Sequence, residues 1–465
     1  MKIFTHQRHS GPEDERYPLP QLVAYGTQHI LTMYGGVIAP PLIVGGAAGL
    51  SPGEMAMLVT AGLFVSGLAT LLQTLGIGPV GSRLPIVQGV SFASVSTMVS
   101  ISNSDGLQSV YGAIIVAGLI GLALSSVFAH LVRLFPAVVT GTIITVIGLS
   151  LLPVALRWAM GNNAKDPAYG SMGNIGFAAL TLVVILVISR VFQGAISRLS
   201  ILIGLVIGTV TAALAGRTDF SAVGDAKIVA LPPILPVGGP TFQAGAIVAM
   251  TIVILVIMTE TTADILAIGE IVGTGVDSKR VAAGLRADMA STTVAPLFGT
   301  FPCSAFAQNV GLVALTGIKS RFVVAAGGVV LVLLGLVPVI GAVVAAIPYP
   351  VLGGAAVVLF GSVAASGIRT LARVNFHDNL NMVIVGVALA VGIIPIAAPT
   401  FWDAFPEWLG TIMHSGISAT ALVAIVLNLL FNEVTLGNRH GASVFAAAED
   451  AGDHLGERLD DDIRD

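Results

Sequence analysis

The sequence predicts an all-α polytopic membrane protein, and its composition supports this class in three ways. Of the 465 residues, 55% are hydrophobic and only 10% are charged. A soluble protein carries about 25% charged residues, so this chain lacks the side chains to cover a water-exposed surface. The 55 glycines suit close helix packing inside a membrane. A water-soluble enzyme and a disordered regulator are therefore excluded, and the net charge of -4 offers no basic face for nucleic acid.

Fourteen segments are predicted to cross the bilayer, because a spanning helix needs about 20 mostly apolar residues. The segments lie at 21–45, 55–76, 85–102, 108–132, 135–156, 172–192, 199–215, 241–268, 281–298, 303–317, 321–346, 349–367, 380–398 and 408–432. Two of them, 85–102 and 303–317, are weak as helices. Each is short, begins at or beside a proline (Pro85 and Pro302), and is rich in Gly, Ser, Gln and Asn.

The distribution of Lys and Arg predicts that both ends of the chain lie in the cytoplasm, since cytoplasmic loops carry an excess of these residues. With the N-terminus inside and an even number of spans, four of the 21 Lys and Arg residues fall outside: Arg157, Lys165, Arg217 and Lys227. We expect a polar cytoplasmic N-terminal segment at 1–20, without a cleavable signal peptide. The residues 433–465 are expected to form an acidic, disordered cytoplasmic tail.

The two weak spans occupy matching positions, because each is the third in its set of seven. Seven is an odd number, so the second set is expected to run through the membrane with opposite topology to the first. Broken spans in corresponding positions of an inverted repeat are typical of a transport site near the middle of the bilayer. The alternative is that both segments are poor helices or re-entrant connectors.

Three acidic residues lie inside the predicted spans, where a carboxylate costs a few kcal/mol and marks a functional site by default. Glu260 and Asp264 are four residues apart and share one face of a helix, and Asp288 lies in the next span. Buried carboxylates of this kind suit proton transfer. The alternative is a structural network in which an aspartate ties hydroxyls and backbone amides of a broken span.

The first span is interrupted by Gln28 and His29. His29 is either a titrating group or a neutral hydrogen-bonding partner in a packed bundle. No cluster of His and Cys indicates a metal site, and no Gly-rich phosphate loop indicates ATP-driven pumping, so no cofactor is expected.

Four motifs, in the same order along the chain, resemble those of the nucleobase–ascorbate transporter family, also called nucleobase:cation symporter-2. Residues 308–317 (QNVGLVALTG) resemble its signature motif, and residues 260–267 (ETTADILA) resemble its acidic motif. Gln28 and His29 resemble its first-span pair, and residues 78–89 (GPVGSRLPIVQG) resemble the approach to its third span. The resemblance runs from about residue 18 to residue 432.

The resemblance implies fourteen spans in two inverted sets of seven, with the third and tenth spans each beginning as a short β-strand. It implies a core domain at 21–133 and 241–346, and a gate domain at 134–215 and 349–432. It also implies a homodimer in the cell (plasma or inner) membrane, with a core that moves like an elevator. The division into core and gate domains does not follow from hydropathy.

The resemblance also implies roles for individual residues. The residues expected to bind substrate are Glu260, Gln308, Ser91, Phe92, Phe306 and Ala307. The residues expected to support coupling or brace the site are Asp264, Asp288, His29, Gln28 and Asn309. A glutamate and a glutamine offer acceptors and donors that complement the N–H and C=O edges of a purine.

The predicted activity is uptake of xanthine or uric acid by proton symport, because Gln308 stands where uracil-type members tend to carry glutamate. Ser91 stands where some xanthine-selective members carry asparagine, which leaves urate and xanthine both open. The alternatives are a permease for uracil or another nucleobase, and an anion exchanger of the same fold. An intramembrane protease using Asp264 and Asp288 is a third possibility, but no protease-like motif accompanies these residues.

Overall fold

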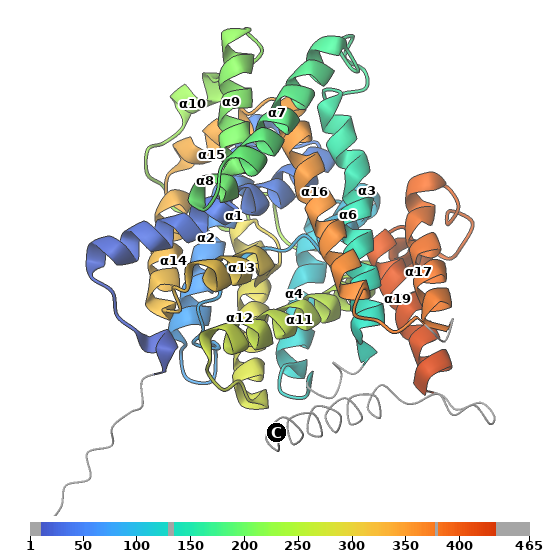
Figure 1. Ribbon diagram of the computed structural model, residues 1–465. Helices are drawn as coiled ribbons and strands as arrows, with labels where there is room; N and C mark the ends of the chain where they lie inside the picture. Colours follow the sequence, from blue (N-terminus) through green and yellow to red (C-terminus); the bar gives the residue numbers. More distant parts are fainter. Residues whose placement is uncertain (1–10, 129–133, 377–379, 434–465) are drawn as a thin grey trace, which may run out of the picture.

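The computed structural model describes residues 11–128, 134–376 and 380–433, which fold mainly into helices (Figure 1). The first half of the chain contains η1 (Pro12–Asp14), α1 (Leu19–Ala47), α2 (Pro52–Leu75), β1 (Gln88–Val90), α3 (Val95–Asp105), α4 (Leu107–Leu124), α6 (Ala137–Ala159), α7 (Met172–Val191), α8 (Ala195–Arg198), α9 (Ser200–Leu214) and α10 (Ser221–Asp225). The second half contains α11 (Ala244–Val272), α12 (Ser278–Val294), η3 (Ala295–Phe298), β2 (Cys303–Ala305), α13 (Ala307–Thr316), α14 (Arg321–Gly335), α15 (Pro338–Ala345), α16 (Tyr349–Leu371), α17 (Leu380–Ala397), α18 (Glu407–Met413), α19 (Gly416–Asn428) and η4 (Leu429–Glu433). The predicted acidic tail lies outside the described residues, apart from its first position.

The predicted class, a helical membrane protein, is confirmed by the length and apolar composition of the helices. Within the described residues, eight helices are long and apolar enough to cross a membrane: α1, α2, α4, α6, α7, α11, α16 and α17. A ninth span results if the bent pair α14 and α15 counts as one. Val183, Leu186 and Val187 of α7 are each at least half exposed, as expected for side chains that face lipid. The count of fourteen spans stays a prediction.

The predicted span at 321–346 is not one straight helix. It is divided into α14 and α15, which meet at an angle of 78°. Pro338 begins α15, and a residue before a proline is forced out of the helical region, as the φ of −114° and ψ of 85° at Val337 show. Hydropathy does not report this break, because both pieces are apolar.

Two short strands join the two halves of the chain. β1 pairs with β2 in antiparallel register, with Gln88 opposite Ala305 and Val90 opposite Cys303. Both strands are almost entirely buried. A pair of three-residue strands needs further partners, because backbone groups within a membrane protein must be satisfied by the protein itself.

A threonine from a neighbouring helix supports each strand in the same way. The Thr70 hydroxyl of α2 accepts from the Gln88 N–H (2.9 Å) and donates to the Gln88 carbonyl (3.3 Å). The Thr292 hydroxyl of α12 accepts from the Cys303 N–H (3.1 Å) and donates to the Cys303 carbonyl (3.2 Å). These hydroxyls thus satisfy backbone N–H and C=O groups of the strands, which have no helical hydrogen bonds.

Glycines allow two pairs of helices to approach closely. A Cβ on Gly67 of α2 would lie 2.6 Å from the backbone nitrogen of Val332 in α14. A Cβ on Gly148 of α6 would lie 2.6 Å from the carbonyl oxygen of Phe360 in α16. Small residues at such crossings let backbones pack together inside a membrane.

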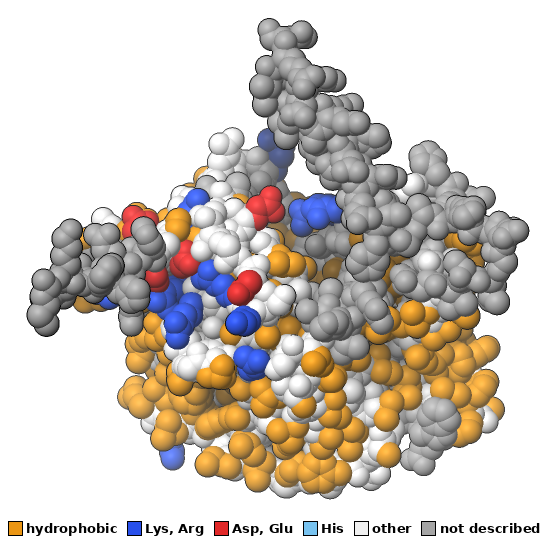
Figure 2. All heavy atoms as spheres, turned by 90° about the horizontal axis from the view of Figure 1, so that it is seen from below, with side chains coloured by type: hydrophobic (Ala, Val, Ile, Leu, Met, Phe, Trp, Pro, Cys, Tyr) orange, Lys and Arg blue, Asp and Glu red, His pale blue; other side chains and the backbone are white. Residues whose placement is uncertain are grey.

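The N-terminal segment folds back onto the helical bundle at its charged face. Glu13 of η1 pairs with Arg280 (2.8 Å), and Asp14 pairs with Arg321 (2.7 Å). The Ser320 hydroxyl also donates to the Glu15 carbonyl (2.6 Å). Figure 2 views the molecule from below Figure 1 and shows charged side chains gathered there, with hydrophobic side chains covering much of the rest of that view.

Candidate functional site

The candidate site is centred on the paired strands, at the points where α3 and α13 begin. Ser91 and Phe92 follow β1, and Phe306 and Ala307 follow β2. The Ser91 N–H donates to the Pro302 carbonyl (2.8 Å), and the Phe306 N–H donates to the Val87 carbonyl (3.1 Å). These two amides are therefore engaged in the strand pairing, whereas the amides of Phe92 and Ala307 have no hydrogen bond among the described residues.

Two aromatic rings, those of Phe92 and Phe306, lie beside the strand pair and near Gly36 of α1. Phe306 is buried, and its ring fits where Gly36 and Gly89 have no side chain, because a Cβ on either would press against the ring. Phe92 is half-buried, and its ring lies 6.0 Å from that of Phe360 in α16, at an interplanar angle of 75°. Phe306 and Phe92 are thus placed beside the strands by packing from α1 and α16.

Asp288 is fully buried and is connected to β2 through one threonine. The Thr261 hydroxyl donates to Asp288 Oδ2, and the same hydroxyl accepts from the Ala305 N–H (3.3 Å). These contacts match the alternative given for Asp288 in the sequence, in which an aspartate ties a hydroxyl and a backbone amide of a broken span. Thr261 follows Glu260 directly, so the acidic part of α11 lies against β2.

Glu260 and Asp264 are both half-buried on α11. Neither carboxylate has a hydrogen bond or ion pair among the side chains that the structure describes. They are thus two acceptors, one helical turn apart, that remain available for a ligand or a proton.

His29 of α1 and Asn309 of α13 are buried and contact each other. The Asn309 side-chain Nδ2 lies 2.8 Å from His29 Nδ1, within hydrogen-bond distance. The sequence did not predict this pairing. Gln28 is half-buried beside His29, and its carbonyl accepts from the Thr32 hydroxyl (2.8 Å). Gln308 falls in the first turn of α13, and its side chain lies outside the described part of the structure.

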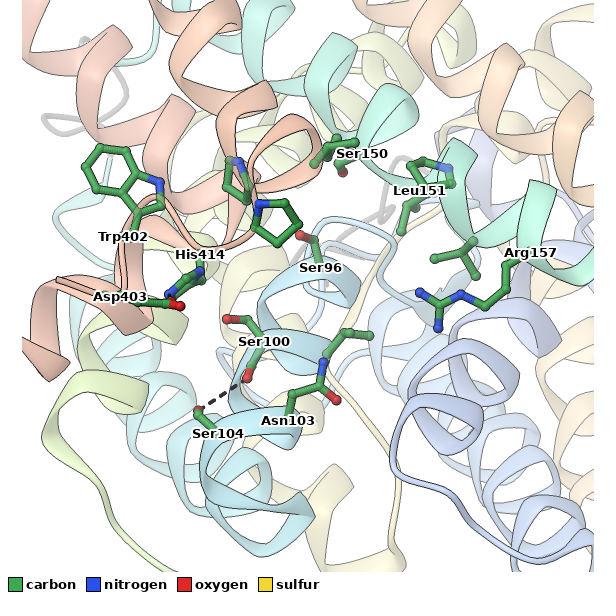
Figure 3. A pocket seen from close by; sticks show the side chains of 18 of the residues that line it. Ser96, Ser100, Asn103, Ser104, Ser150, Leu151, Arg157, Trp402, Asp403 and His414 are labelled. Atoms are coloured by element: carbon green, nitrogen blue, oxygen red, sulfur yellow. Dashed lines mark hydrogen bonds and ion pairs between the residues drawn. The ribbon is translucent and has the colours of Figure 1, made fainter. Parts of the chain in front are cut away.

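A cavity of about 800 Å³ lies beyond α3, and none of the predicted substrate-binding residues lines it. Its walls come from α3, α6, the end of α17, α18 and the residues between them, and the start of α19 (Figure 3). This cavity was not predicted from the sequence. The signal was present as a polar face of α3, formed by Ser96, Ser100, Asn103 and Ser104. Among the described residues, no group of three His, Cys, Asp or Glu side chains is arranged to hold a metal ion.

Apolar helices with two non-helical segments that meet in the protein interior define an integral membrane protein of the transporter class. Residues 20–401 match the sequence model of the Permease family (Xan_ur_permease). The chain belongs to this family, and it is a transporter and not an enzyme.

Characterised relatives and solved structures resemble the chain over most of its length. The uric acid transporter UacT of Escherichia coli (strain K12) is 40% identical over 91% of this chain and 88% of that protein. The xanthine permease of Bacillus subtilis (strain 168) is 38% identical over 88% of this chain and 93% of that protein. The transmembrane domain of the cyanobacterium bicarbonate transporter BicA superposes with a TM-score of 0.58 at 15% identity, covering 90% of this chain and 100% of that one. This structural likeness concerns the fold alone.

Proposed function

We propose that the protein takes up a purine nucleobase, xanthine or uric acid, by proton symport. The relatives, which include a uric acid transporter and a xanthine permease, support the substrate class. The observation that carries the proposal is the pair of unpartnered carboxylates, Glu260 and Asp264, on the part of α11 that contacts β2. Carboxylates next to interrupted backbone offer both a binding partner for a ring N–H and a group that takes up a proton.

The proposed binding roles divide between side chains and backbone. Glu260 accepts hydrogen bonds from the ring N–H groups, and Gln308 pairs with a carbonyl and an N–H of the heterocycle. Phe92 and Phe306 pack beside the ring, and Ser91 and Ala307 complete the cradle. Of the amides at this position, those of Phe92 and Ala307 are the donors not used by the strand pair.

The remaining residues are proposed to couple proton movement to the change of state. Asp264 is the unpartnered carboxylate nearest to Glu260 along α11, so it is suited to carry the proton. Asp288, through Thr261, and Asn309, with His29 and its neighbour Gln28, brace β2 and the start of α13.

We also propose two inverted sets of seven spans, with both termini in the cytoplasm. In this arrangement a core at 21–133 and 241–346 moves against a gate at 134–215 and 349–432, and two copies form a dimer. Support comes from the equivalent roles of Thr70 and Thr292, each of which holds one strand from a neighbouring helix. An anion exchanger is less well supported, because the relatives at 38–40% identity are a uric acid transporter and a xanthine permease, whereas the bicarbonate transporter shares the fold alone.

Uptake of labelled xanthine and urate into cells that lack their own purine permeases tests the proposal. Accumulation is expected to stop when a protonophore collapses the proton gradient, and to be indifferent to removal of sodium. Competition by a panel of purines and pyrimidines then ranks the substrates. Absence of uptake for xanthine, urate and uracil alike would refute the substrate class, and sodium-dependent accumulation would refute proton coupling.

The variant Glu260→Gln is expected to lose substrate binding and still reach the membrane in folded form. Glu270→Gln is the matched control, because Glu270 is an exposed residue further along the same helix. Unchanged affinity in Glu260→Gln would remove this residue from the site.

A further inference from the structure

The cavity beside α3 has a polar wall and an aromatic wall. Ser96, Ser100, Asn103 and Ser104 present three hydroxyls and an amide from one face of α3. On another side lies Trp402, whose ring contacts Phe405 at 5.2 Å between centroids. The indole N–H of Trp402 has no hydrogen-bond partner among the described residues. A flat, apolar surface next to hydrogen-bonding groups suits a planar heterocycle rather than a simple ion.

The charged side chains that line the cavity differ in whether they have a partner. Asp403 Oδ1 lies 3.2 Å from His414 Nε2, so this carboxylate faces a histidine. Arg157, at the end of α6, also lines the cavity and is exposed, and its guanidinium has no hydrogen bond or ion pair with any described residue. Figure 3 shows Arg157 on one side of the cavity, Trp402, Asp403 and His414 on the other, and the polar residues of α3 between them. Of the charged side chains in the cavity, Arg157 is thus the one without a partner among the described residues.

The position of the cavity connects it to the candidate site. Its α3 wall begins at Ser96, in the first turn of the helix that follows Phe92. Its other walls come from α6, from residues 395–405 and from Gly416 at the start of α19, all within the proposed gate. By the predicted topology these are the outer ends of their spans. A solute that reaches Phe92 between core and gate from outside would therefore pass through this cavity.

We propose that this cavity is an entry subsite that binds the anionic form of the planar substrate, with Arg157 as its counter-charge. The inference rests on the proposed function. Urate is largely a monoanion in mildly acidic and neutral water, whereas xanthine is mostly neutral in mildly acidic water. Arg157 thus favours urate over xanthine at the entrance, before the substrate reaches Glu260. A positive group in a recessed site raises the local concentration of an anion and its rate of association.

Initial rates of uptake in mildly acidic buffer, measured for both urate and xanthine, test this subsite. In Arg157→Gln the KM for urate is expected to rise about fivefold or more, with the KM for xanthine within about twofold of wild type. Arg157→Lys keeps the charge and is expected to behave nearly as wild type. Lys165→Gln is the matched control, since Lys165 is an exposed cation on the same predicted side that does not line the cavity.

A second variant acts in the opposite direction and keeps the test decisive if Arg157→Gln fails to reach the membrane. Asp403→Asn removes the negative charge from the facing wall, and it is expected to lower the KM for urate without changing that for xanthine. Added salt is expected to raise the KM for urate in the wild type, because it screens exposed charges.

Outcomes that overturn the subsite differ from those that overturn the function. If the wild type takes up both compounds but Arg157→Gln changes them equally, or changes neither, the subsite is refuted alone. A rise in the urate KM in Asp403→Asn would refute it as well. If the wild type takes up neither compound, the proposed function fails and the subsite fails with it.

Discussion

A single hydroxyl, that of Thr261, connects three elements that meet at the candidate site. It donates to Asp288 of α12 and accepts from the backbone of Ala305 in β2, while its own residue belongs to α11. The acid and the strand amide are thereby held by the same atom. Thr261 therefore links Asp288 to β2, a role that the presence of a threonine in the acidic motif does not by itself indicate.

Replacing Thr261 by valine keeps the shape and removes the hydroxyl. We expect the free energy of unfolding to fall by about 1 to 3 kcal/mol, because a buried carboxylate loses a donor and a strand amide loses its acceptor. Substrate affinity should fall as well, since Phe306 directly follows β2. Thermal unfolding in detergent and a binding assay measure both effects.

The matched control is Thr259→Val, two residues earlier on α11. Thr259 is also buried, but its hydroxyl donates only to the Leu255 carbonyl of the same helix. If both variants lose equal stability and affinity, the connection through Thr261 has no special role.

The ion pair between Glu13 and Arg280 gives the protein a predictable response to acid. Burial acts to raise the pKa of Glu13, but hydrogen bonds from Arg280 and Thr274 outweigh it and hold the pKa below the ordinary value of 4.5. A carboxyl whose pKa is lowered by folding stabilises the folded state at pH values above its unfolded pKa. That stabilisation is lost as the pH falls through the lower folded value.

The variant Glu13→Gln is therefore expected to be less stable than wild type by about 1 to 2 kcal/mol at neutral pH. The difference should shrink as the pH drops below 4.5, where the wild-type carboxyl becomes protonated in the unfolded chain and then in the folded one. Thermal unfolding over a series of pH values tests this. Glu15→Gln, at an exposed residue near the pair, should show no such convergence; a difference that grows in acid would contradict the assignment.

At the scale of elements, the strand pair depends on the absence of a side chain at Gly89. A Cβ there would press against the ring of Phe306, which has no room to retreat, because Gly36 of α1 lies against another edge of the same ring. Overpacking of a buried ring costs about 1 to 3 kcal/mol and displaces it.

We expect Gly89→Ala to raise the KM for substrate by about tenfold, since a loss of 1.4 kcal/mol in binding corresponds to that factor. Uptake kinetics at equal surface expression provide the measurement. Gly386→Ala in α17 is the control, because nothing lies within 4 Å of a Cβ at that position. An unchanged KM in Gly89→Ala would show that the placement of Phe306 does not matter for binding.

The sequence predicted the positions at which helices are interrupted, but it did not predict the residue contacts that form there. Pro85 and Pro302 marked both broken segments, because proline and amides depart from the apolar helical pattern. The register that places Gln88 opposite Ala305 was not predicted, since it joins residues far apart in the chain. The pairing of His29 with Asn309 was missed for the same reason. Pro338 is a local signal for the bend, but the apolar residues on both sides of it led to the prediction of one continuous span at 321–346.

At the scale of the whole molecule, the proposed core and gate meet at a small polar contact. The Thr97 hydroxyl of α3 lies 2.6 Å from that of Ser415, at the start of α19, and both residues are buried. If the core slides against the gate during transport, this contact must break and form again in every cycle.

A disulfide between Thr97→Cys and Ser415→Cys is therefore expected to stop uptake when oxidised, and reduction should restore it. The control is Ser109→Cys with Thr241→Cys, whose hydroxyls lie 2.7 Å apart within the proposed core. Cross-linking this second pair should leave uptake intact. Transport that continues through a fully formed cross-link at Thr97 would contradict the sliding motion. The native Cys303 is buried and is retained in both variants.

Composition predicted the class of the molecule, because a chain with 10% charged residues has few other solutions. It did not predict how the N-terminal segment folds back. Glu13 and Asp14 were counted only as part of a polar N-terminal segment, and their partners Arg280 and Arg321 lie in the second half of the chain. Arg157 was counted only as a charge on the outer side, because hydropathy carries no information about which side chains surround a cavity.

The pairing of β1 with β2 also has a consequence for biosynthesis. The first strand has no complement until the ribosome has made residues 303–305, long after the segment carrying residues 88–90 has entered the bilayer. Until then its amides depend on Thr70 and on whatever water or insertion machinery surrounds the nascent chain. The first half is therefore an unfinished structure during synthesis, and a chain truncated before Cys303 would be left with an unmatched strand inside the membrane.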